Sequence, residues 1–79
     1  MDRIIYHLVW EKETKEWKLK FGECVEDSDQ FKYKLVRRGQ TLCNNHWAEK
    51  KPAQLIIHKR DGKIEKEFTY GRDPVRTKG

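Results

Sequence analysis

The 79-residue sequence has little cysteine, proline or glycine and no long apolar run. Two cysteines, Cys24 and Cys43, are too few for a disulfide framework and are predicted to be free thiols, as is typical of a reducing compartment. No apolar stretch approaches the roughly 20 residues of a membrane span, and the start, MDRIIYHLVW, lacks the pattern of a signal peptide. These absences argue against a disulfide scaffold and a membrane partner, and they predict a cytoplasmic protein.

Charged residues, by contrast, are abundant and unevenly distributed. They make up 39% of the chain against 35% hydrophobic residues, a composition that by itself would favour disorder. Residues 1–31 carry five basic and eight acidic side chains, a net charge of −3, whereas residues 32–79 carry thirteen basic and five acidic ones, a net charge of +8. Such an asymmetry informs on partners and not on the fold.

The apolar residues are periodic, which argues for a folded chain. Segments 4–11 and 16–21 alternate apolar and polar positions and are joined by the polar loop KETK, a pattern that predicts a β-hairpin. With Glu11 opposite Glu16, three pairs fall on one side of the hairpin: Trp10 with Trp17, Leu8 with Leu19, and Tyr6 with Phe21. The other side then carries Ile5, His7 and Val9 beside Lys18 and Lys20, whose ammonium groups stay in water.

The middle of the chain allows two interpretations. Segment 22–29 is acidic and predicts a loop, and segment 30–36 alternates again, which predicts a third strand with Phe31, Tyr33 and Leu35 turned toward the core. A helix with Ser28 or Asp29 as N-cap is the alternative. We favour the strand, because the alternative would leave Gly39 in the middle of a helix.

Segment 38–51 is the predicted helix, because apolar residues recur there at spacings of three and four before Pro52. Segments 54–60 and 63–70 flank Asp61-Gly62, which predicts a second hairpin with a type I′ turn. In that hairpin Leu55 faces Phe68, and Ile57 lies on the same side as Ile64.

The predicted fold class is therefore α+β: a single domain, residues 1–79, with a small antiparallel sheet of about five strands in the order β-β-β-α-β-β, one helix packed on one face, and an irregular tail at 71–79. Exposed sheet edges make a homodimer plausible. The predicted core consists of Tyr6, Leu8, Trp10, Trp17, Leu19, Phe21, Leu42, Trp47, Leu55, Ile57, Ile64 and Phe68.

The C-terminal third, IIHKRDGKIEKEFTYGRDPVRTKG, carries a resemblance to a bacterial family, domain of unknown function 2188. Members of that family end in a pattern like HxRDGxIxxxxxYGxDPxxxKG, and this chain matches it at His58, Arg60, Asp61, Gly62, Ile64, Gly71, Asp73, Pro74, Lys78 and Gly79. His7-Leu8-Val9 and Trp17-Lys18-Leu19-Lys20 resemble the family's first two strands, whereas Trp47 replaces a smaller aliphatic residue. The resemblance implies a sheet of about five strands with one helix, and it implies no activity.

Basic residues in the second half form the candidate site. Around the second turn they are His58, Lys59, Arg60 and Lys63, and elsewhere they are Lys32, Lys34, Arg37, Arg38 and Arg72. Lysine and arginine bind DNA or RNA phosphates by releasing counterions, so the sequence favours weak, sequence-independent nucleic-acid binding. The predicted inward orientation of the aromatics leaves no exposed stacking platform. The alternative is a protein-protein interaction or self-association module in which the basic residues are only solvated surface.

Catalytic and metal-binding patterns are weak. Cys43 and His46 have a spacing used by metal sites, but they fall on the core-facing side of the predicted helix. The sequence contains no phosphate-binding glycine loop, no GxSxG and no HExxH. We therefore expect no enzyme activity, no cofactor, no metal and no small-molecule substrate.

Overall fold

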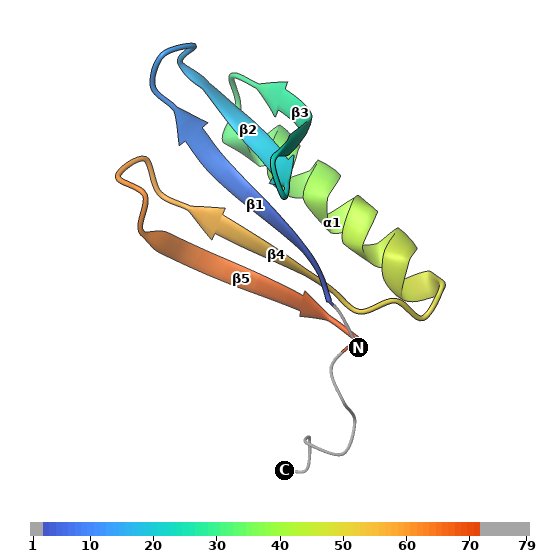
Figure 1. Ribbon diagram of the computed structural model, residues 1–79. Coiled ribbons are helices and arrows are strands. Elements are labelled where there is room, and N and C mark those ends of the chain that lie inside the picture. Colours follow the sequence, from blue (N-terminus) through green and yellow to red (C-terminus); the bar gives the residue numbers. More distant parts are fainter. Residues whose placement is uncertain (1–2, 72–79) are drawn as a thin grey trace.

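The computed structural model describes residues 3–71 and contains one helix beside a five-stranded sheet (Figure 1). The strands are β1 (Ile4–Glu11), β2 (Glu16–Phe21), β3 (Cys24–Asp29), β4 (Ala53–His58) and β5 (Ile64–Tyr70), and the helix is α1 (Lys32–Ala48). The sheet order is β3-β2-β1-β4-β5, and α1 runs along one face. The predicted α+β class, the order of elements and the packing of one helix on the sheet are confirmed. The predicted tail lies outside the described residues, apart from Gly71.

The first hairpin has the predicted register. Tyr6 pairs with Phe21, Leu8 with Leu19, and Trp10 with Trp17. The four-residue loop closes through the Lys15 amide, which donates to the Glu11 carbonyl at 2.8 Å, with Lys15 at a φ of 58°. Because the three pairs share one side, β1 and β2 present a continuous apolar surface to α1.

The sheet is mixed and not wholly antiparallel. β1 and β4 are parallel neighbours, with Tyr6 beside Leu55 and Leu8 beside Ile57, whereas the other three pairings are antiparallel. A parallel pair needs a long crossover connection, which the segment from β2 through α1 supplies. The sequence patterns identified the strands but not this direction.

Two predictions for the middle of the chain are wrong. Segment 22–29 contains strand β3, which pairs with β2 across a register shift between Leu19 and Lys20. This strand lies at an edge of the described sheet and its residues are mostly exposed, so no apolar alternation marks it in the sequence. Segment 30–36 is helical from Lys32 onward, with Phe31 as N-cap in place of Ser28 or Asp29.

The contact between Gly39 and Leu55 explains why the strand interpretation failed. Gly39 is buried within α1, and a β-carbon built on it would lie 2.8 Å from Leu55 Cδ1. A glycine therefore lets the helix backbone approach β4 closely, which offsets its low helix propensity. The residue that argued against a helix at this position is the one that lets the helix dock.

The helix ends at Ala48, three residues before the predicted end. Lys50 has a φ of 66°, its amide donates to the Trp47 carbonyl, and the Lys51 amide donates to the His46 carbonyl. These two bonds form a Schellman motif, which terminates a helix before Pro52 is reached.

The second hairpin has a different turn from the predicted one. Leu55 pairs with Phe68 as expected, but among the central residues Gly62 alone has a positive φ, 95°, so the turn is not type I′. The Gly62 amide donates to the Lys59 carbonyl, and the Lys59 amide donates to the Lys63 carbonyl, which encloses a three-residue loop. A register shift follows between Ile57 and His58, so Ile64 pairs with His58, away from α1.

The core lies between α1 and the three central strands. Buried side chains are Tyr6, Leu8, Trp17, Leu19, Leu35, Cys43, Ala53, Leu55 and Ile57, with Trp10, Leu42 and Phe68 partly buried against them. Three predicted core residues are instead exposed, namely Phe21 at 43%, Trp47 at 43% and Ile64 at 53%. Within residues 3–71, no helix has both the length and the apolar character needed to cross a membrane.

Candidate nucleic-acid interface

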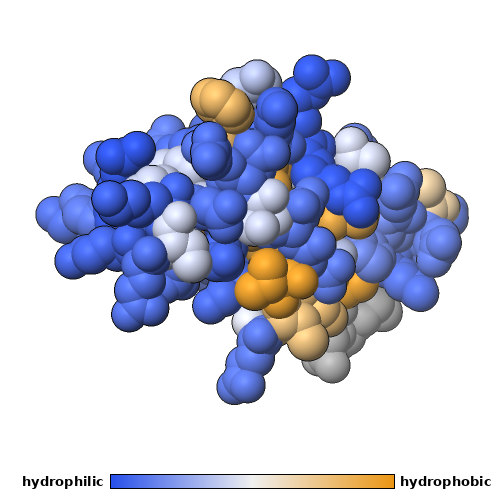
Figure 2. All heavy atoms as spheres, turned by 90° about the horizontal axis from the view of Figure 1, so that it is seen from above, coloured by the Kyte–Doolittle hydropathy of each residue, from blue (hydrophilic) through white to orange (hydrophobic). Residues whose placement is uncertain are grey.

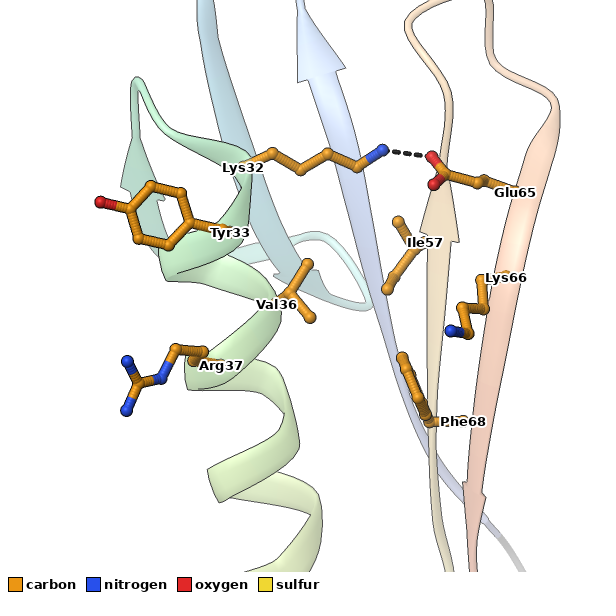
Figure 3. A pocket seen from close by; sticks show the side chains of 8 residues that line it. All are labelled: Lys32, Tyr33, Val36, Arg37, Ile57, Glu65, Lys66 and Phe68. Carbon is orange, nitrogen blue, oxygen red and sulfur yellow. Dashed lines mark hydrogen bonds and ion pairs between the residues drawn. The ribbon is translucent and has the colours of Figure 1, made fainter.

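A groove lies between the N-terminal half of α1 and strand β5 (Figure 3). Its volume is about 420 Å³, and Val36, Ile57 and Phe68 form its apolar floor. Lys32 and Lys66 border it, and Tyr33 and Arg37 project outward from the helix at its rim. Residues of α1, β4 and β5 on the same face of the sheet line the groove.

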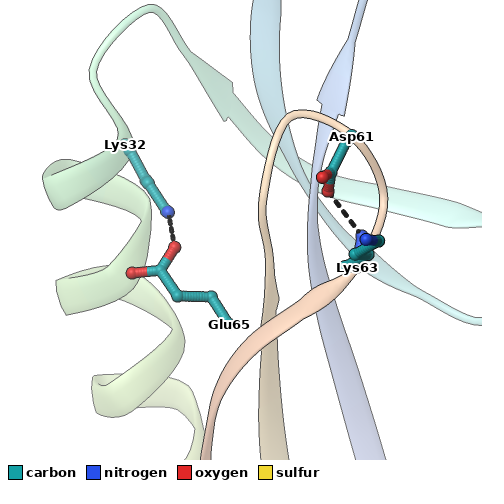
Figure 4. Close-up of polar contacts among 4 residues, drawn as sticks. All are labelled: Lys32, Asp61, Lys63 and Glu65. Carbon is teal, nitrogen blue, oxygen red and sulfur yellow. Dashed lines mark hydrogen bonds and ion pairs between the residues drawn. The ribbon is translucent and has the colours of Figure 1, made fainter.

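Lys32 connects the two walls of this groove. Its ammonium group forms an ion pair with Glu65 of β5 (Figure 4). The same ammonium lies 4.8 Å from the centre of the Trp17 ring. The hydrogen bond from Lys32 lowers the pKa of Glu65. Because both side chains are partly exposed, this pair adds little stability, but it holds the Lys32 ammonium in place beside the groove.

Two aromatic side chains near the start of α1 are exposed, contrary to the sequence prediction. Phe31 is 52% and Tyr33 60% exposed, and their ring centres lie 6.0 Å apart. The Lys34 ammonium lies 5.4 Å from the centre of the Phe31 ring. Of Phe31, Tyr33 and Leu35, which were predicted to face the core together, only Leu35 is buried once α1 begins at Lys32, and both rings face solvent.

The predicted basic patch is divided among several surfaces. Lys32 and Arg37 lie at the groove, whereas Arg38 faces Asp27 of β3, with 3.9 Å between nitrogen and oxygen. At the second turn, Lys59 and Lys63 are exposed and joined by a backbone hydrogen bond. Arg72 lies outside the described residues. The structure therefore brings together only part of the predicted set.

Arg60 and His58 also have partners at that turn. The Arg60 guanidinium lies 4.2 Å from the centre of the Trp10 ring, and Trp10 in turn packs edge-on against Trp17 at 5.2 Å. Arg60 thus lies over the same tryptophan pair as Lys32. His58 instead contacts His7 on the face of the sheet opposite α1, with 3.0 Å between Nε2 of His58 and Nδ1 of His7.

Cys43 and His46 lie on the covered side of the sheet. Cys43 is fully buried, and burial raises the pKa of its thiol to about 11. His46 Nε2 lies 2.8 Å from the Tyr6 hydroxyl, and burial raises the pKa of that hydroxyl. Within the described residues no three histidine, cysteine or acidic side chains gather as metal ligands.

Three residues of the candidate interface were absent from the predicted set: Phe31, Tyr33 and Lys66. Phe31 and Tyr33 were assigned to a strand and hence to the core. The helical alternative would have turned Tyr33 away from Leu35, but it places Phe31 on the same side as Leu35. Lys66 pairs with Ile57 and lines the groove, with its ammonium 5.1 Å from the Phe68 ring centre.

One comparison with known proteins identifies a family. The model of a family described as an uncharacterized protein conserved in bacteria, DUF2188, matches residues 6–70. The match spans β1 to β5, most of the chain, so the protein belongs to this family. No curated protein and no solved structure matches it.

Proposed function

For this member of DUF2188, we propose a non-catalytic role in which it binds single-stranded nucleic acid weakly and without sequence preference. The binding surface, called here the aromatic–basic surface, consists of Phe31, Lys32, Tyr33, Lys34, Arg37 and Lys66. The observation that carries the proposal is the exposed pair Phe31 and Tyr33 set among cations on one end of α1.

Single-strand binding combines phosphate contacts with base stacking. Every base has a flat face, so an exposed ring accepts any base, and removal of such a ring typically costs about 1–3 kcal/mol per base. Lys34 and Arg37 are exposed on the same turn of helix as Tyr33 and can contact flanking phosphates. The groove beside them has an apolar floor and enough volume for one unstacked base.

Acidic residues limit the strength of this binding. Glu65 pairs with Lys32, Asp27 faces Arg38, and the Asp29 carboxylate accepts a hydrogen bond from the Phe31 amide at 2.8 Å. These three carboxylates lower the positive potential around the rings. Weak rather than tight binding follows, with a preference for single strands, whose bases can reach the rings.

Fluorescence anisotropy with labelled 20-nucleotide single strands and the matching duplex tests the proposal at two salt concentrations. We expect micromolar single-strand binding at low salt, and with three phosphate contacts a log–log salt slope of about −2. Tyr33→Ala should weaken binding at least about fivefold through lost stacking. Lys34→Gln/Arg37→Gln should weaken binding and flatten the slope.

Lys12→Gln/Lys15→Gln is the matched control, because it removes the same charge from the exposed loop between β1 and β2. This control should bind like the wild type. Absence of binding at low salt, or an equal loss in both double variants, would overturn the proposal.

The second candidate is a protein-interaction or self-association module. Within residues 3–71 the sheet ends at β3 and β5, so both strands present open edges, and β3 carries Glu26, Asp27 and Asp29 without a basic residue. Edge strands pair with strands of other chains. On the face shown in Figure 2 the surface is mostly hydrophilic with small apolar groups. Light scattering at low and high salt distinguishes a stable oligomer from the monomer that the first proposal expects.

A further inference from the structure

A pair of histidines occupies the face of the sheet that α1 leaves open. His7 lies in β1 and His58 at the end of β4, and the two strands are parallel neighbours. Nδ1 of His7 and Nε2 of His58 are 3.0 Å apart, and the ring centres are separated by 5.2 Å. Both side chains are half-buried, so the pair is held by strands on both sides and still reaches solvent.

The second nitrogen of His58 fixes the arrangement of protons. His58 Nδ1 lies 3.0 Å from the Gly62 carbonyl oxygen, which accepts hydrogen bonds only, so Nδ1 carries the proton and donates it. His58 Nε2 therefore presents a lone pair toward His7. A backbone carbonyl that holds one ring nitrogen and leaves the other free is the arrangement found around metal-binding histidines.

The separation of the two nitrogens also fits chelation. Metal–imidazole bonds of about 2.0–2.1 Å at an angle of roughly 90–109° place two nitrogens about 2.9–3.4 Å apart. In the metal-free pair the proton between the rings belongs to His7 Nδ1. If this proton moves to His7 Nε2 and the two rings tilt, both lone pairs are directed at one metal ion beside the line that joins the two nitrogens.

We propose that His7 Nδ1 and His58 Nε2 form a two-histidine site for a divalent first-row transition metal, Cu²⁺ above Ni²⁺ or Zn²⁺, with water in the remaining positions. Imidazole suits these metals and not Ca²⁺ or Mg²⁺, and Cu²⁺ forms the strongest bonds of the series. Among residues 3–71 no third side chain completes a cluster, so the coordination stays open. This site is independent of the aromatic–basic surface.

Neighbouring charges set the affinity. Lys20 pairs with His7 and Lys18 with Val9, so β2 places two ammonium groups on this face, and Lys18 also contacts Glu16 at 3.6 Å. On the other side, β5 places Glu67 opposite Ile56, and this carboxylate accepts a hydrogen bond from Gln54. The lysines oppose a divalent cation, so binding is moderate, and Lys20→Gln should strengthen it.

The test is a Cu²⁺ titration of the tag-free full chain in a Cys24→Ser background, because Cys24 is an exposed thiol that reduces Cu²⁺. Calorimetry should give one site per chain, and electron paramagnetic resonance should show two imidazole nitrogens. His7→Gln and His58→Gln should each weaken binding at least tenfold, and binding should fall below pH 6 as protons compete. Circular dichroism verifies the fold of each variant, and two variants keep the test decisive should one not fold.

His46→Gln is the matched control, since this third histidine contacts Tyr6 on the covered side of the sheet. It should bind Cu²⁺ like the parent, and Lys20→Gln should bind more tightly. The proposal is overturned if the parent chain binds no Cu²⁺ at micromolar concentration, if the signal shows fewer than two imidazoles, or if His46→Gln weakens binding as much as His7→Gln.

Discussion

In strand β4, Leu55 and Ile57 point toward α1 and are buried, whereas their neighbours Ile56 and His58 point to the open face and are half-buried. The same alternation runs through β1, where Tyr6 and Leu8 are buried and His7 lies on the open face. One face thus supplies packing, and the other carries polar groups such as the histidine pair. The two faces share a backbone, so substitutions at adjacent positions separate their contributions.

The largest effect is expected from Leu55→Ala on the covered face. Leu55 is fully buried beneath Gly39, so truncation leaves a cavity and should lower the free energy of unfolding by about 3 kcal/mol. Ile56→Ala, one residue away on the open face, should cost about 1 kcal/mol. Urea unfolding followed by tryptophan fluorescence measures both values. Equal losses would contradict the division of the sheet into a packed face and an open face.

A second way to sharpen the comparison uses pH. Burial raises the pKa of Cys43 from 9.0 to about 11, so above pH 9 the unfolded state loses this proton before the folded state does. The contribution of Cys43 to stability is present at neutral pH and is lost as pH rises from about 9 to about 11. Because one pKa unit corresponds to about 1.4 kcal/mol, we expect this loss to be roughly 2–3 kcal/mol.

The variant Cys43→Ala isolates this contribution. In the presence of reductant, its unfolding free energy should fall less between pH 8 and pH 11 than that of the wild type. Titrating groups that do not interact with Cys43 cancel in the difference. Cys24→Ser is the control, because it removes the exposed thiol of β3 and leaves the buried thiol of Cys43 in place. Parallel curves for Cys43→Ala and the wild type would refute the assignment.

The sequence predicted those parts of the fold in which apolar side chains alternate and the paired strands are close together in the sequence. The first hairpin is the clearest example, because three cross-strand pairs fix its register. Strand β3 could not be predicted this way, since its side chains are mostly exposed and its pairing rests on the backbone. The register shift that turns Ile64 away from α1 could not be predicted either, because the alternation of side chains in the sequence does not change at that point.

The candidate site was predicted less completely than the fold. Charge alone selected Lys32 and Arg37, and the structure places both at the groove. The exposure of Phe31 and Tyr33 was not predicted, because their spacing to Leu35 of four and two residues fits a strand as well as a helix. The choice between the two depends on how Leu35 packs in the folded protein, where it is buried. The contact between His7 and His58 depends on the parallel pairing of β1 with β4. These strands are distant in the sequence, so no local sequence pattern predicts the contact.

The smallest effect is expected from Gly39→Ala, which tests how closely α1 approaches the covered face. Alanine raises helix propensity by about 1 kcal/mol, but its β-carbon would lie 2.8 Å from Leu55 Cδ1 in a fully packed region. We expect the clash to exceed the gain, with a net loss of about 1 kcal/mol in urea unfolding. Asn45→Ala, on the exposed side of α1, should instead be neutral or slightly stabilising.

A double-mutant cycle with Leu55→Val decides whether that contact is the cause. If Gly39 serves to admit Leu55, the loss from Gly39→Ala should shrink when the shorter valine occupies position 55, giving a coupling energy of about 0.5 kcal/mol or more. Additive losses would mean that the glycine has another role, and that the distance between the helix and the covered face is set elsewhere. Because Ile56 points away from α1, the same cycle with Ile56→Val should show no coupling.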